Sequence, residues 1–193
     1  MTRVPFKAEL LIFDLDGTLA DTKEDLADCV NRALREVGLR EKSREVIYSY
    51  VGSGVRSLIR QALDEEPGPK FEDAIGVFRK YYLKHLLDKT RLYPGMAGVL
   101  DHFDHKRKAV VTNKPQVFTD KILSGLKVTE RFEIIVGGEN GHPLKPDPKM
   151  ILEVLNHTGV EAGRAVMIGD GLNDILAARA AGVPCCAVGY GIG

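Results

Sequence analysis

Residues 10–18, with the sequence LLIFDLDGT, constrain this chain more than any other segment. Their apolar first half predicts a buried strand over 10–13, and Gly17 predicts that the chain turns away soon afterwards. Asp14 and Asp16 stand one residue apart at this end, and two carboxylates so close repel each other unless a positive charge lies between them. Their oxygens are ligands that suit Mg²⁺. The segment therefore predicts a divalent-metal site at a strand end; the simpler alternative is a surface turn that begins with Asp.

The overall composition places the chain among ordinary globular proteins. Its 193 residues are enough for one good core, with or without a small appended domain. Lys plus Arg equals Asp plus Glu, so the net charge of zero does not indicate a nucleic-acid surface. No apolar run approaches the roughly 20 residues that span a bilayer, and residues 1–9 lack the apolar stretch of a signal peptide. We therefore expect a cytoplasmic protein with neither nucleic-acid nor membrane partners.

The three cysteines do not indicate a disulfide-bonded protein. Cys29 stands alone, and Cys185 and Cys186 are adjacent in the apolar run 183–188. This run predicts a buried strand, and not a disulfide or a metal knuckle.

The segment from about residue 20 to about residue 90 predicts helices and no strand. Thr22, followed three residues later by Asp25, resembles a capping box at the start of a first helix, which Gly38 ends. Apolar residues at helical spacing predict three more helices, and Gly and Pro separate them. These helices are expected at 43–50, 55–63 and 71–87, with breaks at 51–54 and 65–70. The pattern predicts a separate helical bundle, which we assign to residues 20–92.

From Tyr93 onwards, strands and helices alternate. Apolar strands separated by helices are typical of a parallel sheet that is covered on both faces. The strands are expected at 109–112, 132–136, 165–168 and 184–188, and the helices at 97–103, 115–126, 148–158 and 172–181. With the strand at 10–13 they predict an α/β fold, a Rossmann-like doubly wound parallel sheet, formed by residues 1–19 and 93–193. No helix is predicted after the last strand, so the sequence leaves open what covers it.

Polar residues collect where these strands end. Thr112 and Asn113 end the second strand, Asp170 and Asp174 follow the fourth, and Lys145 lies in a proline-rich loop between the third and the fourth. Each has a simpler explanation: a strand former, a turn residue, a helix-dipole charge or a solvated lysine. Ligands of such sheets bind at the carboxyl ends of the strands. Carboxylates, a hydroxyl and a lysine gathered there are what phosphoryl transfer requires.

Four motifs in this order resemble those of the haloacid dehalogenase superfamily. They are DLDGT at 14–18, TN at 112–113, KPDP at 145–148 and GDGLND at 169–174. The inserted helices resemble the small α-helical cap of that family. Within it, the chain is most similar to phosphoglycolate phosphatases, through 21–22, 51–54, 93–95 and 137–138. Gly171 differs from the Ser of many relatives, although the two aspartates of that motif keep their spacing.

The resemblance implies distinct roles for the carboxylates. Asp14 would attack phosphorus to form an aspartyl-phosphate, and Asp16 would protonate the leaving oxygen and then deprotonate the attacking water. Mg²⁺ would bind the Asp14 carboxylate, the Asp16 backbone carbonyl and Asp170. Asp174 would support the metal shell or orient Lys145.

The remaining site residues would bind the substrate. Thr112 and the backbone near Leu15 and Asn113 would hold phosphoryl oxygens, and Lys145 would neutralise the transferring group. In the cap, the segment that faces the substrate corresponds to Gly52, Ser53, Gly54 and Arg56. Arg56 would pair with a carboxylate such as that of glycolate; its simpler explanation is a solvated arginine. Lys114 is a further candidate to face the substrate.

The resemblance leaves several functions open. The first is a Mg²⁺-dependent phosphatase acting on a small phosphate monoester, 2-phosphoglycolate in the first place. Because a halide leaves without a proton, an acid at Asp16 points to an oxygen leaving group instead. A sugar phosphomutase similar to β-phosphoglucomutase, an inorganic pyrophosphatase and a non-catalytic binding protein are the alternatives. The chain would act as a monomer or a homodimer on a small phosphorylated metabolite.

Overall fold

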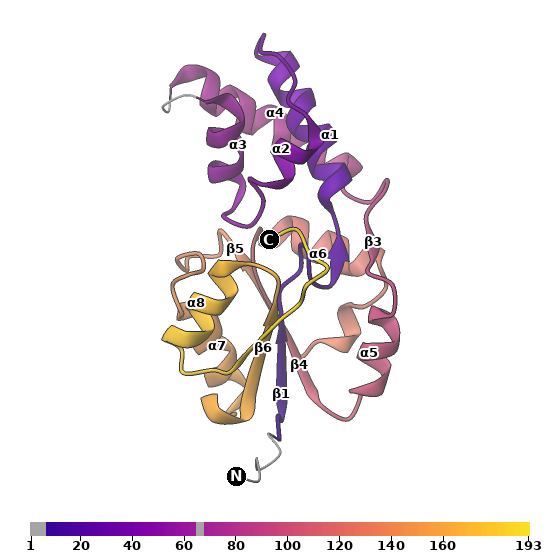
Figure 1. Ribbon diagram of the computed structural model, residues 1–193, viewed down its shortest axis with the longest axis vertical. Coiled ribbons are helices and arrows are strands. Elements are labelled where there is room, and N and C mark those ends of the chain that lie inside the picture. Colours follow the sequence, from indigo (N-terminus) through magenta and orange to yellow (C-terminus); the bar gives the residue numbers. More distant parts are fainter. Residues whose placement is uncertain (1–6, 65–67) are drawn as a thin grey trace.

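A computed structural model describes residues 7–64 and 68–193, and consists of a sheet flanked by helices with a further group of helices above it (Figure 1). The expectations for residues 1–6 and for 65–67 lie outside the described residues. None of the helices in the described ranges is both long and apolar enough to span a bilayer.

The sheet has five parallel strands in the order β5-β4-β1-β6-β7. Its strands are β1 (Leu10–Phe13), β4 (Arg107–Pro115), β5 (Ile134–Gly138), β6 (Ala165–Gly169) and β7 (Cys185–Ala187). The chain adds two strands on one side of β1 and then crosses to the other side. This doubly wound order confirms the predicted fold class. The switch of direction lies between β1 and β6, where such folds bind ligands.

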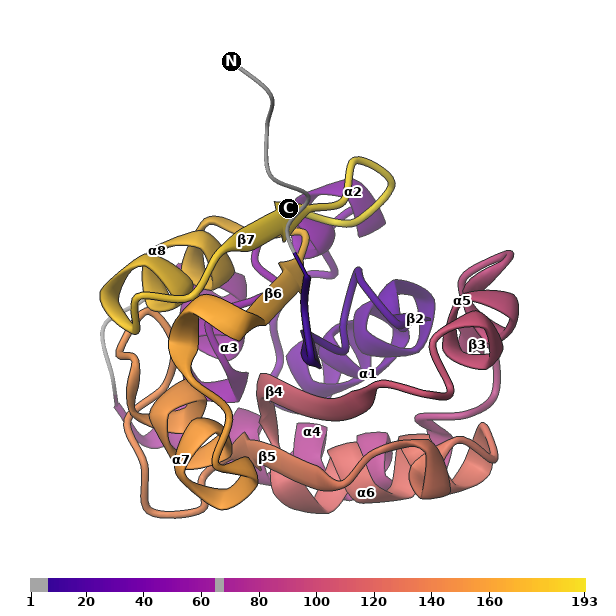
Figure 2. The same ribbon diagram turned by 90° about the horizontal axis from the view of Figure 1, so that it is seen from below.

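Side chains of β1 alternate between two hydrophobic clusters, as the pleat of a strand requires. Leu10 and Ile12 pack with α7 (Lys149–Thr158) and α8 (Leu172–Ala180). Leu11 and Phe13 belong to the cluster that includes α5 (Met96–His102) and α6 (Gln116–Gly125). Figure 2 shows these helix pairs on opposite faces of the sheet. Burial of one large apolar side chain contributes about 1.5–3 kcal/mol, so both faces hold the strand ends in place.

Four helices form the group above the carboxyl edge of the sheet (Figure 1). They are α1 (Lys23–Glu36), α2 (Arg44–Tyr48), α3 (Val55–Leu63) and α4 (Pro69–His85). Helix α4 begins two residues before the expected start because Pro69 suits the first turn. Leu26 and Phe78 of these helices belong to the same buried cluster as Phe13 of the sheet. The helical group therefore rests on the core through apolar contacts.

A short antiparallel ribbon, which the sequence did not predict, joins the two parts. It consists of β2 (Ala20–Asp21) and β3 (Arg91–Leu92). Just beyond it, the buried Asp25 carboxylate accepts hydrogen bonds from the backbone of Lys89 at 3.0 and 3.1 Å, and from the N–H and Oγ1 of Thr90 at 2.9 and 2.8 Å. We propose that this ribbon is the boundary between the core and the cap.

These contacts correct the predicted capping box. Thr22 makes no side-chain hydrogen bond to the start of α1, and its Oγ1 donates to Asp16 Oδ1 at 2.6 Å. Asp25 is occupied by the returning chain. Both side chains serve long-range contacts, which a local pattern does not reveal.

The predicted burial of the adjacent cysteines is also wrong. Cys185 and Cys186 are exposed. They lie on β7, which among the described residues forms one edge of the sheet and pairs with β6. An apolar run indicates a strand, but it does not indicate whether that strand is central or at an edge.

Candidate active site

The carboxyl ends of β1 and β6 bring two aspartates together. The N–H of Asp14 donates to the carbonyl of Ile168 at 2.9 Å, so the end of β1 is tied to β6 just before Asp170. Gly17, with φ of +79°, lets the chain turn here. A Cβ at this position would lie 2.1 Å from Asp170 Oδ2. The glycine thus permits both the turn and the close approach of the two loops.

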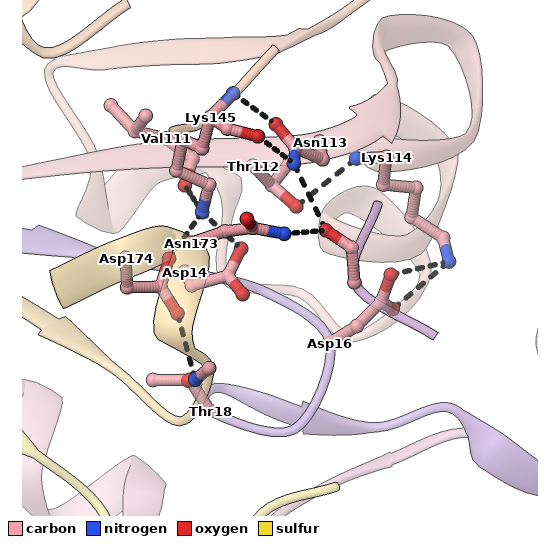
Figure 3. Close-up of polar contacts among 12 residues, drawn as sticks. Asp14, Asp16, Thr18, Val111, Thr112, Asn113, Lys114, Lys145, Asn173 and Asp174 are labelled. Atoms are coloured by element: carbon pink, nitrogen blue, oxygen red, sulfur yellow. Dashed lines mark hydrogen bonds and ion pairs between the residues drawn. The ribbon is translucent and has the colours of Figure 1, made fainter. Parts of the chain in front are cut away.

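Lys145 lies between two buried carboxylates (Figure 3). Its Nζ donates to Asp174 Oδ1 at 2.6 Å and to the carbonyl of Val111 at 2.8 Å. The same nitrogen is 3.0 Å from Asp14 Oδ1, at ion-pair distance but without a directed hydrogen bond. Asp174 is in the first turn of α8, where its Oδ2 accepts from the N–H of Gly171 at 3.1 Å. Asp174 therefore orients Lys145 toward Asp14.

Burial and charge oppose each other at Asp14. Burial raises the pKa of Asp14 from 3.8 to about 7, and repulsion from Asp174 and Asp16 adds to this effect, whereas Lys145 counteracts it. Burial alone would lower the pKa of Lys145, but the carboxylates of Asp14 and Asp174 outweigh it, and the pKa is raised. Lys145 is thus a permanent cation, while Asp14 needs more positive charge than Lys145 supplies.

The residues around Asp14 fit a divalent cation. Carboxylate oxygens of Asp14, Asp170 and Asp174 lie within 4.8 Å of one another. Three carboxylates face one ammonium group, so the cluster has excess negative charge. Hard oxygen donors in this number suit Mg²⁺. Asp170 also accepts hydrogen bonds, from Thr18 Oγ1 at 3.3 Å and from the backbone of residues 192 and 193 at 2.7 and 2.8 Å.

Asp16 has different partners from Asp14. Its carboxylate accepts from Thr22 Oγ1 at 2.6 Å and from Lys114 Nζ at 2.9 and 3.0 Å. It does not belong to the group of carboxylates within 4.8 Å that surrounds Asp14. The side chain of Lys114 is only 3% exposed. The two aspartates of the first motif therefore lie in separate surroundings, one beside Lys145 and one beside Lys114.

Asn113 connects the lysine loop to the cap. Its Oδ1 accepts from the N–H of Lys145 at 2.7 Å, and its Nδ2 donates to the carbonyls of Lys145 and Gly52, both at 2.9 Å. Asn173 donates to the carbonyl of Gly52 and to Ser53 Oγ, both at 3.2 Å. Asn173 belongs to the GDGLND motif, but no role of its own was predicted for it, because its residue type does not indicate a contact with the cap. Both carboxamides hold the cap segment 51–54 against the core.

A cavity lies between this edge and the cap. The core contributes mainly polar residues to it, together with Pro115 and Phe118, whereas the cap contributes apolar side chains and glycine backbone. Its lining includes Asp14, Asp16, Thr112, Asn113 and Lys114 from the core, and Leu26, Val51, Gly52, Gly54, Val55, Leu58, Phe78 and Tyr82 from the cap. The cavity thus has a charged floor and an apolar roof.

The structure places the other predicted residues as follows. Thr112 is buried within β4, which continues to Pro115 and not only to the predicted end at residue 112, and its Oγ1 accepts from the N–H of Lys114 at 3.3 Å. The side chain of Leu15 lies in the core, and its carbonyl accepts hydrogen bonds within the turn that follows β1. Arg56 does not line the cavity. It pairs with Glu72 at 2.6 Å on the surface of the cap, above the ring of Phe71.

Comparisons with known proteins place the chain in one family. Residues 11–188 match the family described as haloacid dehalogenase-like hydrolase. The chain is 36% identical to a phosphoglycolate phosphatase of Thiobacillus denitrificans, covering 99% of this chain and 87% of that protein. It is 37% identical to phosphoglycolate phosphatase 1 of Pseudomonas aeruginosa, covering 98% and 71%.

A solved structure shows the same fold. The crystal structure of a predicted phosphoglycolate phosphatase from Haemophilus somnus superposes with a TM-score of 0.91 and 31% identity, covering 95% of this chain and 86% of that one. Fold, motif order and sequence identity over nearly the whole chain lead to the same assignment. The chain belongs to the haloacid dehalogenase-like hydrolase family.

Proposed function

We propose that this protein is a Mg²⁺-dependent phosphatase that hydrolyses 2-phosphoglycolate through an aspartyl-phosphate on Asp14. The observation that carries the proposal is the separation of the two aspartates. Both line the cavity beneath the cap, but Asp14 lies beside Lys145, Asp170 and Asp174 at the switch point, whereas Asp16 is paired with Lys114 and Thr22. One is placed to attack phosphorus and the other to serve the leaving oxygen.

The chain's own groups can perform two successive displacements. In the first, an oxygen of Asp14 forms a bond to phosphorus, the ester P–O bond breaks, and Asp16 donates its proton to the leaving oxygen. In the second, water gives a proton to Asp16 and attacks phosphorus, and the bond from Asp14 to phosphorus breaks. Lys145, 3.0 Å from Asp14, stabilises the charge on the transferring group.

A divalent cation fits the surroundings of Asp14. Asp14 and Asp170 would hold Mg²⁺ with the backbone carbonyl of Asp16, and Asp174 would support it from behind. When bound, the cation supplies positive charge that favours the ionised form of Asp14 and offsets its repulsion from the phosphate. Asp174 keeps its hydrogen bonds to Lys145 and Gly171, which suits a supporting role.

The cavity favours a small leaving group. Its roof is formed by apolar side chains such as Leu58 and Phe78, and buried sugar hydroxyls would find few partners there, which is unfavourable. This supports hydrolysis of a small ester over a sugar phosphomutase reaction. The phosphoglycolate phosphatases that the chain resembles support glycolate as the leaving group. The partner is thus a small phosphorylated metabolite.

The experiment is a phosphate-release assay with 2-phosphoglycolate, glucose 1-phosphate and pyrophosphate, each with Mg²⁺ and with EDTA. We expect release from 2-phosphoglycolate only when Mg²⁺ is present. Conversion of glucose 1-phosphate to glucose 6-phosphate, or faster hydrolysis of pyrophosphate, would contradict the proposal. Activity that survives EDTA would contradict the metal assignment.

A further inference from the structure

The cavity beneath the cap contains one buried cation, Lys114, to which the mechanism above assigns no role. Among its described lining residues, Lys114 is the only one with a positive charge. Lys145, the other buried lysine of the site, faces Asp14 and Asp174 instead (Figure 3). The phosphoryl side and the leaving-group side of the site therefore each have a lysine of their own.

Two contacts fix the position of the Lys114 ammonium group. It donates to both oxygens of Asp16 at 2.9 and 3.0 Å, and it lies 4.7 Å from the centre of the Tyr82 ring. One contact comes from the core and the other from helix α4 of the cap. The cation is thus held at the junction of the two parts, where a leaving group would lie.

The surroundings make this charge effective. Leu26, Phe78 and Phe118 also line the cavity, and an ion pair is stronger in such apolar surroundings than in water. An anionic leaving group would otherwise meet only the carboxylates of Asp14 and Asp16, which repel it. The positive charge of Lys114 offsets the repulsion between these carboxylates and the leaving group, on the side of the cavity away from Lys145.

The distances suit a carboxylate next to the ester oxygen. A general acid lies about 2.6–3.2 Å from the atom that it protonates, and Lys114 is in hydrogen-bond contact with Asp16. In 2-phosphoglycolate, one methylene carbon separates the carboxyl carbon from the ester oxygen, so the carboxylate oxygens are three bonds from the ester oxygen and lie within about 4 Å of it. With the ester oxygen at Asp16, that carboxylate lies within reach of Lys114.

We propose that Lys114 binds the carboxylate of the leaving group and gives the enzyme its preference for small phosphate esters with an anionic leaving group. This rests on the proposed function above, which requires hydrolysis at Asp14 and Asp16. It also assigns the role to Lys114 and not to Arg56, the cation expected from the cap sequence. Arg56 is half-exposed and paired with Glu72.

A different role would leave a different kinetic signature. If Lys114 only positioned Asp16, its removal would slow all esters that need a proton on the leaving oxygen by the same factor. If it contacts the substrate carboxylate, its removal would act on anionic leaving groups and would raise their KM. The ratio of kcat/KM for two esters separates these two roles.

The test compares 2-phosphoglycolate with 2-hydroxyethyl phosphate, which has an alcohol in place of the carboxylate. We expect wild type to prefer 2-phosphoglycolate. Lys114→Met should lower kcat/KM for 2-phosphoglycolate by about 100-fold, largely through KM, and for 2-hydroxyethyl phosphate by less than about tenfold. Lys84→Met, at an exposed position of α4, is the matched control and should change neither value.

Three results would overturn the inference: a wild type without preference between the two esters, an equal loss on both in Lys114→Met, or a selective loss in Arg56→Met instead. The wild-type comparison needs no variant, so it holds even if Lys114→Met does not fold. A wild type that hydrolyses neither ester with Mg²⁺ would instead reject the proposed function, and the inference with it.

Discussion

The two aspartates of the first motif are two residues apart in sequence but lie in different surroundings. Asp14 lies among Lys145, Asp170 and Asp174, at the switch point of the sheet. Asp16 lies against Lys114 and Thr22, on the side of the cap. The first set of residues comes entirely from the core, from strand ends, loops and the first turn of α8. The second includes the linker to the cap, so chemistry and selectivity are assigned to different parts of the chain.

This difference shows how the edge of the sheet can support the reaction while the inserted helices of the cap select the substrate. The residues around Asp14 are fixed by the sheet, whose central strand β1 is buried on both sides. The roof over Asp16 comes from helices inserted between β1 and the rest of the sheet. Substitutions in the first surroundings should therefore affect every substrate, and those in the second should affect substrates unequally.

The largest effect is expected at Asp14. Asp14→Asn removes the nucleophile, so kcat should fall on the order of 10⁵-fold for all phosphate esters. The fold should persist, because the change is isosteric and removes a buried repulsion. Phosphate release and circular dichroism measure the two outcomes. Substantial activity in this variant on any ester would show that another residue attacks phosphorus.

Asp16→Asn should have a smaller and substrate-dependent effect. An aliphatic ester needs a proton on its leaving oxygen, and we expect its rate of formation of the phosphoenzyme to fall by about 10²–10⁴-fold. 4-Nitrophenyl phosphate has a far better leaving group, so the burst of nitrophenol from this first step should fall much less. Asp73→Asn, at an exposed position of α4, is the control. Equal losses in the first step for both esters would remove the distinction between the two aspartates.

Weakening the contact between the core and the cap should have a modest effect on KM. Asn173→Ala removes the hydrogen bonds to Gly52 and Ser53. Each is worth about 0.5–1.5 kcal/mol, so we expect KM to rise by roughly two- to tenfold while kcat changes little. Asn156→Ala on α7 should leave both unchanged. A large fall in kcat without a change in KM would instead place Asn173 in the chemical step.

The remaining effect is on the pH dependence of stability without metal. The pKa of Asp14 is raised to about 7 in the folded protein, so folding disfavours its ionised form. Wild type should therefore lose stability relative to Asp14→Asn as the pH rises from about 4 to about 7, and the difference should stay constant above that. Thermal melts of both proteins in EDTA should show this as a change on the order of 10 °C in the difference between their melting temperatures. A difference that does not change with pH would contradict the burial of the charge.

The sequence was sufficient for most of the core and for the residues around Asp14. Apolar runs that alternate with helices predicted all five strands of the main sheet, and polar residues at strand ends predicted Asp14, Asp170, Asp174 and Lys145 as one group. The strand ends meet at one edge for a topological reason, so position along the chain carries the information.

The remaining features depend on contacts that have no local pattern. Ala20 pairs with Leu92 across more than 70 residues of chain, and Asp25 binds the backbone of Thr90. Which of Arg56 and Lys114 is placed to bind the substrate carboxylate depends on where each side chain points, and the residue type does not indicate this. Both are basic residues in plausible segments, but Arg56 faces Glu72 and Lys114 faces Asp16.

The central claim, that Asp14 attacks and Asp16 serves the leaving oxygen and the water, is tested most directly by trapping the phosphoenzyme. Asp16→Asn should be mixed with 4-nitrophenyl phosphate and Mg²⁺, quenched in acid and digested for mass spectrometry. Because this variant cannot take the proton from water, a phosphoryl group should accumulate on Asp14. No phosphoryl group should appear on the double variant that carries both Asp16→Asn and Asp14→Asn. A phosphoryl group on any other residue, or one that persists without Asp14, would contradict the claim.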